Sequence, residues 1–205
     1  MITIRFAPIE TLPAIPIRPK GIVSKAFLSR GLATLPQAAN YVKRLPYGRN
    51  RSAEDAMILF QDGFGDCLAK HGIIARLAEE LEVAVHRLEG FYRLTEDIVT
   101  GVGAILAAYG LSYIPRTHCF LSFEKHYVDL TDGNCTGKNG PIEEYIEIIR
   151  VKPEQTRAEA DLMIRDFYAK VCEVDADFAR LGIEGMLEVL ERCIALNSAS
   201  CGLPR

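Results

Sequence analysis

The chain has 205 residues, of which 49% are hydrophobic and 25% are charged, and its formal net charge at pH 7 is −3. This length allows one domain with a substantial core. The chain has no extended run of Lys and Arg, which argues against nucleic acid as the main partner, because binding to phosphates normally needs a basic surface.

The sequence gives no sign of secretion or of a membrane span. Residues 1–8 lack the charged start and the long apolar core of a signal peptide. No stretch approaches the ~18 consecutive apolar residues that a spanning helix requires. The six cysteines, at positions 67, 119, 135, 172, 193 and 201, form no tight framework, so most of them should be reduced and several buried. We therefore expect a cytoplasmic protein without a membrane partner.

The first third of the chain predicts an extended segment followed by two helices. Four prolines within residues 1–22 argue against a regular helix there. Residues 33–45 carry apolar side chains at helical spacing and predict a helix that ends near Pro46. After a turn at residues 47–50, Ser52 is the expected cap of a short helix over residues 53–60.

The middle of the chain predicts the elements that carry the candidate site. Glycines within residues 62–65 allow a tight turn, and the clearest helix of the chain starts directly after it, at Cys67. Residues 83–94 favour a strand, and residues 101–110 favour a short helix that a glycine ends. Residues 117–131 predict a β-hairpin.

Past residue 150 the chain predicts two long helices, from Pro153 to about Val174 and from Asp177 to about Leu196. Their apolar stripes are too broad to be left in water, so the helices should pack on each other and on either the rest of the domain or a second subunit. We expect intramolecular packing, with a homodimer as the alternative. The whole is an α+β fold: a core over residues 1–150 with an extended N-terminal segment, and C-terminal helices over 151–205, in one compact unit.

Cys67 is the residue that most strongly indicates chemistry. A thiol at a helix start lies where unpaired backbone N–H groups and the helix dipole favour the thiolate. An imidazole on a neighbouring strand can take the thiol proton, and a carboxylate can hold that imidazole in one tautomer. His118 and Asp129 follow in chain order and supply these two groups. For the other five cysteines we expect the plainer role of small, buried apolar residues.

The periodicity of a strand places His118 and Asp129 on one face of the predicted hairpin. Successive side chains alternate between faces, so a turn centred on Glu124-Lys125 sets Asp129 opposite Phe120 and diagonal to His118. Diagonal positions are roughly 7–8 Å apart at the backbone, within the reach of the side chains. The other face is largely apolar and is the expected core face. A shift of one residue would separate the pair and bury the polar face.

Two alternatives compete at this site. His71 lies four residues after Cys67 on the same helical face, but a side chain one turn into the helix is poorly placed to reach the thiol, so we expect a hydrogen-bonded helix histidine. A zinc site built from His118 and Cys119 is disfavoured, since adjacent strand residues point to opposite faces and the chain has no closely spaced zinc-finger pair. We therefore expect neither a metal nor a cofactor.

At these residues the chain resembles the transglutaminase-like superfamily of papain-type thiol enzymes. That family places a cysteine at a helix start after a glycine-containing turn, then a histidine at a strand start and an aspartate on the next strand. The matching blocks are Gly65-Asp66-Cys67, His118-Cys119-Phe120 and Tyr127-Val128-Asp129-Leu130-Thr131. The pattern Gly-x-Cys-x-x-Lys-His, with Tyr-Ile-Pro-x-x-His at 113–118, is similar to an uncharacterised bacterial branch of that family. The resemblance covers residues 40–135.

The resemblance implies a papain- or transglutaminase-like core in which the helix carrying the cysteine packs on an antiparallel sheet. It also implies a catalytic triad of Cys67, His118 and Asp129 that attacks an amide or ester carbonyl and forms an acyl-enzyme, which water or an amine resolves. The expected partner is a peptide, a protein or a small amide substrate. The alternative is a catalytically silent domain of the same family that binds a peptide or protein.

The oxyanion of such a reaction needs two hydrogen-bond donors. We expect the backbone N–H of Cys67 to be one, because it lies at the helix start. The second is assigned to the turn at residues 47–50, through Asn50 or Tyr47, although an ordinary interhelical turn is the more economical interpretation.

Overall fold

A four-stranded antiparallel sheet with the order β4–β3–β2–β6 lies at the centre of the molecule. In the computed structural model, which describes residues 1–52, 55–131 and 134–200, β2 (Val85–Leu94) and β3 (Ile114–Phe123) pair along their whole length. The outer strands β4 (His126–Val128) and β6 (Glu147–Arg150) are shorter. A second, two-stranded sheet pairs β1 (Ile2–Thr3) with β5 (Glu144–Tyr145). The fold is therefore of the expected α+β class.

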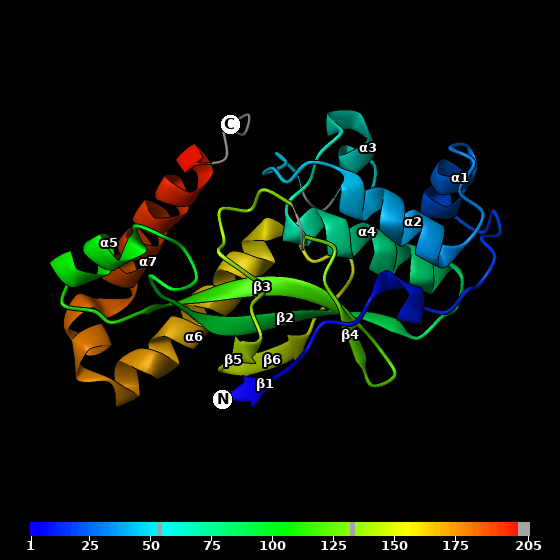
Figure 1. The fold of residues 1–205 in the computed structure, drawn as a ribbon. Helices are drawn as coiled ribbons and strands as arrows, with labels where there is room; N and C mark the ends of the chain where they lie inside the picture. Colours follow the sequence, from blue (N-terminus) through cyan, green and yellow to red (C-terminus); the bar gives the residue numbers. More distant parts are fainter. Residues whose placement is uncertain (53–54, 132–133, 201–205) are drawn as a thin grey trace.

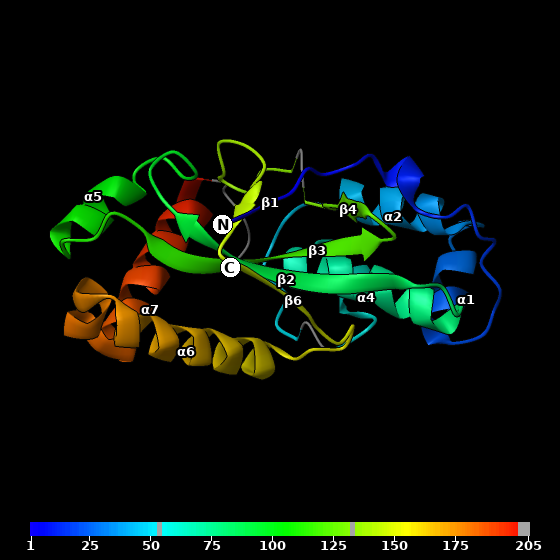
Figure 2. The ribbon, with the colours of Figure 1, turned by 90° about the horizontal axis from the view of Figure 1, so that it is seen from below.

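The helices form two groups at opposite ends of the long strands (Figure 1, Figure 2). The first group follows the 3-10 turn η1 (Ile9–Thr11) and comprises α1 (Ile22–Leu28), α2 (Leu35–Arg44), α3 (Ile58–Asp62) and α4 (Cys67–Glu80). The second comprises α5 (Val102–Ala108), α6 (Arg157–Val174) and α7 (Ala176–Ser200). None of the helices in the described ranges combines the length and the apolarity that crossing a membrane requires.

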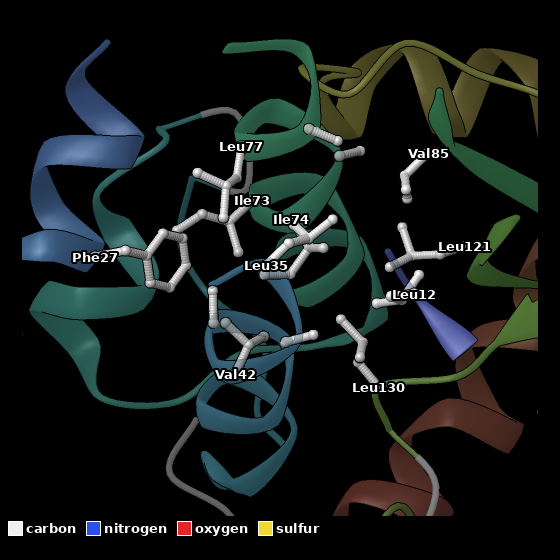
Figure 3. Close-up of a cluster of buried hydrophobic side chains, with 14 of the residues drawn as sticks. Leu12, Phe27, Leu35, Val42, Ile73, Ile74, Leu77, Val85, Leu121 and Leu130 are labelled. Carbon is white, nitrogen blue, oxygen red and sulfur yellow. The ribbon is translucent and has the colours of Figure 1, made fainter. Parts of the chain in front are cut away.

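The first hydrophobic core surrounds α4, which is buried on nearly all sides. It is covered by α1 and α2 on one side and by β2 and β3 on the other. Figure 3 shows Leu35 of α2 and Leu121 of β3 packed around Ile74 of α4. Burial of each such side chain stabilises the fold by roughly 1.5–3 kcal/mol. Because α4 is enclosed rather than amphipathic, Lys70 and His71 also lie inside the molecule.

The second core lies between the other end of the sheet and the C-terminal helices. Phe91 of β2 and Phe167 of α6 stack with their ring centroids 3.9 Å apart, and Met186 of α7 is fully buried. The helices α6 and α7 pack on each other, and both contact β3. Helix α7 bends at Gly182, where φ is 66°, a backbone conformation that glycine adopts without strain. The broad apolar stripes of α6 and α7 are therefore largely buried by packing against other parts of the same chain.

The predicted register of the hairpin is confirmed. The pairs along β3 and β4 are Leu121–Val128, Ser122–Tyr127 and Phe123–His126. The turn is therefore Glu124-Lys125, and Glu124 adopts φ 51°, in the left-handed region that two-residue hairpin turns use. Continuing the same register places Asp129 opposite Phe120.

Both faces of the hairpin are buried, although the face with His118 was expected to be the polar one. Phe6 and Tyr145 pack on Phe120 and cover this face. Gly90 of β2, the direct partner of His118, makes this possible: a Cβ there would lie 2.3 Å from the Tyr145 ring. The candidate site is therefore enclosed by segments far from it in the sequence.

Helix α1 was not predicted, because its N-terminus is stabilised by a distant residue. The carboxylate of Glu80, at the end of α4, accepts hydrogen bonds from the N–H groups of Val23 (3.0 Å) and Ser24 (2.7 Å). These are helix-start N–H groups that have no intrahelical acceptor. Ser24 adds a local contact, since its hydroxyl accepts the N–H of Gly21 (2.9 Å), but no local signal identifies the cap that Glu80 forms.

Two other helix starts differ from the prediction. The helix expected over residues 53–60 begins at Ile58, while residues 53 and 54 lie outside the described ranges. Helix α6 begins at Arg157 rather than near Pro153, because Thr156 and Glu159 form a capping box. Both helices therefore start closer to the C-terminus than the sequence pattern indicates.

Candidate active site

Helix α4 begins at Cys67, and its first turn is fixed from two sides. The Asp66 carboxylate accepts a hydrogen bond from the Ala69 N–H (3.0 Å) and so caps the helix. Its other oxygen pairs with the guanidinium of Arg157, at the start of α6 (2.7 Å). The N–H of Cys67, like the other first N–H groups of a helix, has no intrahelical acceptor. The thiol therefore lies in the positive field of a firmly held helix start.

His118 and Asp129 are joined as the register predicts. The distance from His118 Nε2 to Asp129 Oδ2 is 2.8 Å, and the exposed fractions are 2% and 6%. Asp129 Oδ1 accepts the N–H and the hydroxyl of Thr131 (2.7 and 2.8 Å). Burial favours the neutral acid, but the hydrogen-bonded imidazole outweighs it and holds the pKa of Asp129 well below its usual range. The ionised carboxylate fixes the proton on Nε2 and leaves Nδ1 for the base function.

The Cys67 thiol interacts with two neighbouring side chains of β3, Cys119 and His118, and both act to lower its pKa. The Cys119 contact contributes most to a pKa of Cys67 well below that of a free thiol; burial opposes it, and His118 lowers the pKa further. Burial and Lys138 act to lower the pKa of His118, but Asp129 and Cys67 outweigh them and the pKa is raised. The pair therefore favours the thiolate–imidazolium form.

Cys119 is buried, as expected, but it is also part of the site. Its sulfur accepts a hydrogen bond from Nη2 of Arg87 (3.5 Å), and Arg87 is held in turn by Oε1 of Gln155 (3.0 Å). The Arg87 contact occupies a lone pair of Cys119 and leaves its S–H to donate to Cys67. Strand β4 pairs with Leu121–Phe123 of β3, so among the described residues no strand pairs with His118 and Cys119 on that edge. This explains how two residues of opposite parity both contact one thiol.

Replacing Cys119 with alanine is expected to raise the pKa of Cys67, because the thiolate loses a hydrogen-bond donor. The pH midpoint of Cys67 alkylation by iodoacetamide should move upward by about one pH unit. In the Cys119→Ser variant a hydroxyl donor remains, so the midpoint should stay near that of the unmodified chain. A midpoint that does not move in the alanine variant would show that Cys119 only fills space.

His71 has the expected role of a hydrogen-bonded helix histidine. Its Nδ1 lies 2.8 Å from the carbonyl oxygen of Cys67, and its Nε2 accepts the N–H of Leu130 (2.8 Å). Its Nε2 also lies 3.4 Å from Oδ1 of Asp129. His71 thus joins the start of α4 to the strand segment that carries Asp129.

Lys70 anchors the loop that follows Asp129. Its fully buried ammonium donates to the carbonyl oxygens of Lys43 (3.3 Å) and Leu45 and to Oδ1 of Asn134 (2.6 Å). Burial lowers the pKa of Lys70 to about 8. Lys70 and His71, the Lys-His pair that follows Cys67 in the sequence, therefore have structural roles. Both side chains connect α4 to the segments around the site.

The two residues expected to supply an oxyanion donor are placed differently. Asn50 is 2% exposed, and its amide N–H groups bond to Oδ2 of Asp62 (2.8 Å) and to the carbonyl of Phe64 (2.9 Å). It braces the turn before Cys67 and has no N–H left for an oxyanion. Tyr47 interacts electrostatically with Cys67; burial and that thiolate raise its pKa well above the usual value, so its hydroxyl remains a donor. Of the two, only Tyr47 is available.

Two basic side chains at the site were not anticipated from the sequence. Nζ of Lys138 lies 3.3 Å from Nδ1 of His118. Arg116 precedes His118 by two residues and shares its face of β3, and its Nη1 is buried without a hydrogen-bond acceptor. Neither side chain forms an ion pair with a carboxylate in the part of the chain that the structure describes. Strand parity could have identified Arg116, whereas Lys138 comes from a loop without a recognisable pattern.

Two cavities adjoin these residues. One, of about 240 Å³, is lined mainly by polar side chains that include Asp129, Thr131 and Lys138. The other, of about 610 Å³, shares Asn134 with the first and includes Tyr47. Among the described residues, no three His, Cys, Asp or Glu side chains are arranged to hold a metal ion.

Comparison with protein-family models, with curated proteins and with solved structures found no match to the chain. The function must therefore be inferred from the chemistry of the assembled residues. They provide a thiol at a helix start, an imidazole whose Nδ1 lies 3.3 Å from Nζ of Lys138, an ionised carboxylate that orients the imidazole, and an adjoining polar cavity.

Proposed function

We propose that the protein is a thiol-dependent acyl-transfer enzyme, a peptidase, amidase or transferase, with a papain- or transglutaminase-like core. The observation that carries the proposal is the grouping of Cys67, His118 and Asp129, in which Asp129 is hydrogen-bonded to His118 and His118 acts to lower the pKa of the Cys67 thiol. The three residues come from a helix start, a strand and the segment after the next strand. If His118 and Asp129 formed only a structural ion pair, no thiol would be needed beside the imidazole. If Cys67 were only a buried apolar residue, no imidazole oriented by a carboxylate would be needed beside the thiol.

In this mechanism the Cys67 thiolate attacks an amide or ester carbonyl, and the carbonyl π electrons move to oxygen. The Cys67 N–H and the Tyr47 hydroxyl are the proposed donors to that oxyanion. The imidazolium of His118 then protonates the leaving amine or alcohol as its bond to carbon breaks, which leaves an acyl-enzyme. Water or an amine, deprotonated by His118, attacks the thioester and returns the thiol. Asp129 keeps the ring oriented throughout.

The second candidate is a catalytically silent domain of the same type that binds a peptide or protein. The burial of His118 and Asp129 and the covered face around them are compatible with it. The two candidates differ in turnover, because only an enzyme releases the acyl group.

The experiment uses 4-nitrophenyl acetate as the acyl donor. We expect a burst of about one equivalent of nitrophenol, an acetyl group mapped to Cys67 by mass spectrometry, and its release on further incubation or on addition of a primary amine. The Cys67→Ala variant should lack the burst, and Cys135→Ala, which removes an exposed thiol, should retain it. An acetyl group that remains on Cys67 would favour the silent domain, and acetylation spread over several cysteines would remove the proposal.

A further inference from the structure

We propose that the site selects acyl donors that carry a carboxylate close to the reacting carbonyl, and that Arg116 and Lys138 bind this carboxylate. The inference rests on the proposed function, because it names the substrate class of the same thiol. It is carried by a set of buried donors that lack acceptors and by the charge balance around Cys67.

Three buried donor groups without an acceptor gather on the face of the sheet that carries His118. Arg116 pairs directly with Tyr92 across β3 and β2, and Tyr145 packs on Gly90, the partner of His118. Nη1 of Arg116 and the hydroxyls of Tyr92 and Tyr145 are buried, and none of them has a partner in hydrogen-bonding geometry. The guanidinium of Arg116 lies close enough to the Tyr92 hydroxyl to oppose the effect of burial on the pKa of Tyr92. Leaving one such group unpaired costs about 1–3 kcal/mol. A ligand that only accepts hydrogen bonds would satisfy all three, and a carboxylate is such a ligand.

The charges at the site are also unbalanced. With His118 and Lys138 protonated, three cations, Arg116, Lys138 and His118, face two anions, the Cys67 thiolate and Asp129. Burial lowers the pKa of Lys138, so an additional anion would stabilise its charged form. Asp129 is already hydrogen-bonded to His118 and Thr131. A buried cation without a carboxylate partner is costly, and a bound anion would remove that cost.

The geometry limits where the carboxylate of the substrate can lie. Lys138 is next to the reacting imidazole, at 3.3 Å from its Nδ1. Arg116 is two residues along the strand from His118, which is about 6.8 Å of backbone. An anion held between these two side chains would be about one residue away from the carbonyl that the thiolate attacks.

The test compares two alkylating reagents of nearly equal size, iodoacetate, which carries a carboxylate, and iodoacetamide, which is neutral. Both react with the same thiolate, so the ratio of their rate constants is independent of the thiolate fraction and reports the surrounding charge. The ratio at Cys67 is measured by peptide mapping at low salt and divided by the ratio for glutathione. We expect a normalised ratio of about ten, which falls as salt is added.

Single substitutions assign the effect to residues. Arg116→Gln and Lys138→Gln should each lower the normalised ratio by about threefold or more, whereas Arg116→Lys keeps a positive charge and should stay near the unmodified value. The matched control is Lys125→Gln, which removes one charge from the exposed hairpin turn and should leave the ratio unchanged. Thermal unfolding of each variant verifies that it is folded, and the Lys138 and Arg116→Lys variants carry the test if Arg116→Gln does not fold.

The outcomes separate the substrate class from the reaction. A normalised ratio near one, or a ratio unaffected by the substitutions while Cys67 still reacts faster than Cys135, would overturn the carboxylate proposal and leave acyl transfer standing. Cys67 that reacts no faster than Cys135 with either reagent would remove the proposed function itself.

The carboxylate can come from the end of a peptide or from an acidic side chain. Two pairs of N-acetylated peptides distinguish these sources, and the measurement is how well each peptide protects Cys67 from iodoacetamide. In the first pair one peptide has a free C-terminus and the other a C-terminal amide. In the second pair the residue next to the scissile bond is Glu in one peptide and Gln in the other. Protection by the acid member of one pair identifies the source. Equal protection by the acid and the amide in both pairs would contradict the proposal.

Discussion

Replacing His118 with alanine should slow the alkylation of Cys67 at pH 6 by about 30-fold, because a charge-assisted hydrogen bond to the thiolate is worth about 2 kcal/mol. In the native chain the imidazolium of His118 and the Cys119 thiol both stabilise the thiolate. Cys119 makes the largest single contribution, but His118 acts through both a hydrogen bond and its positive charge. We therefore expect the two contributions of His118 together to exceed that of Cys119. At pH 9 and above the difference should narrow, since a free thiol is then mostly ionised.

His126→Ala is the matched control for this experiment. It removes another histidine of the same hairpin, the residue of β4 that pairs with Phe123 of β3. This substitution should leave the alkylation rate of Cys67 unchanged. Cys135, which is exposed, serves as an internal reference in every digest. If His118→Ala alkylates at pH 6 as fast as the unmodified chain, His118 does not act on the thiol.

The placement of His118 beside Asp129 could be predicted because strand geometry is local. The alternation of side chains and a two-residue turn fix the register, and the register fixes which residues are diagonal neighbours. The start of α4 at Cys67 was equally local, since a glycine-containing turn and the capping side chain of Asp66 precede it. These two local inferences were sufficient to name the three residues of the candidate triad.

The surroundings of the triad could not be predicted, because they depend on tertiary contacts. Cys119 became part of the site through Arg87, which the loop before α6 holds from more than sixty positions away in sequence. Lys138 lies on a loop that Lys70 anchors through Asn134. Parity alone placed Cys119 on the face opposite His118, and only the incomplete coverage of β3 by β4 lets both contact Cys67.

The same distinction applies to the fold. Helix α2, which has a local capping box of Thr34 and Gln37, was predicted close to its observed bounds. Helix α1 depends on the carboxylate of Glu80 and was missed. The polar face of the hairpin was expected to be open, and it is covered because Gly90 leaves room for Tyr145.

Replacing Glu89 with glutamine should change how stability depends on pH. Glu89 is 1% exposed and lies opposite Cys119, and one of its carboxylate oxygens has no hydrogen-bond partner. Burial raises its pKa to about 7, although Arg87 acts to lower it. An ionised Glu89 would also repel the Cys67 thiolate, so the neutral acid suits a site that must hold a negative sulfur.

The sign of the effect follows from proton binding. Between the unfolded pKa of Glu89, near 4.5, and its folded value of about 7, the folded chain binds more protons than the unfolded chain, so the free energy of unfolding falls as pH rises. The ionisation of Glu89 thus lowers the free energy of unfolding by about 3 kcal/mol in total, and this decrease is complete above pH 7.

Glutamine keeps the shape of the side chain and cannot ionise. Denaturant unfolding from pH 5 to 7.5 should therefore show the Glu89→Gln variant gaining stability relative to the unmodified chain. Glu144→Gln, at an exposed strand position, should show a constant difference. A pH-independent difference for Glu89→Gln as well would mean that Glu89 is already ionised in the folded protein at pH 5, and that the positive charge of Arg87 outweighs burial.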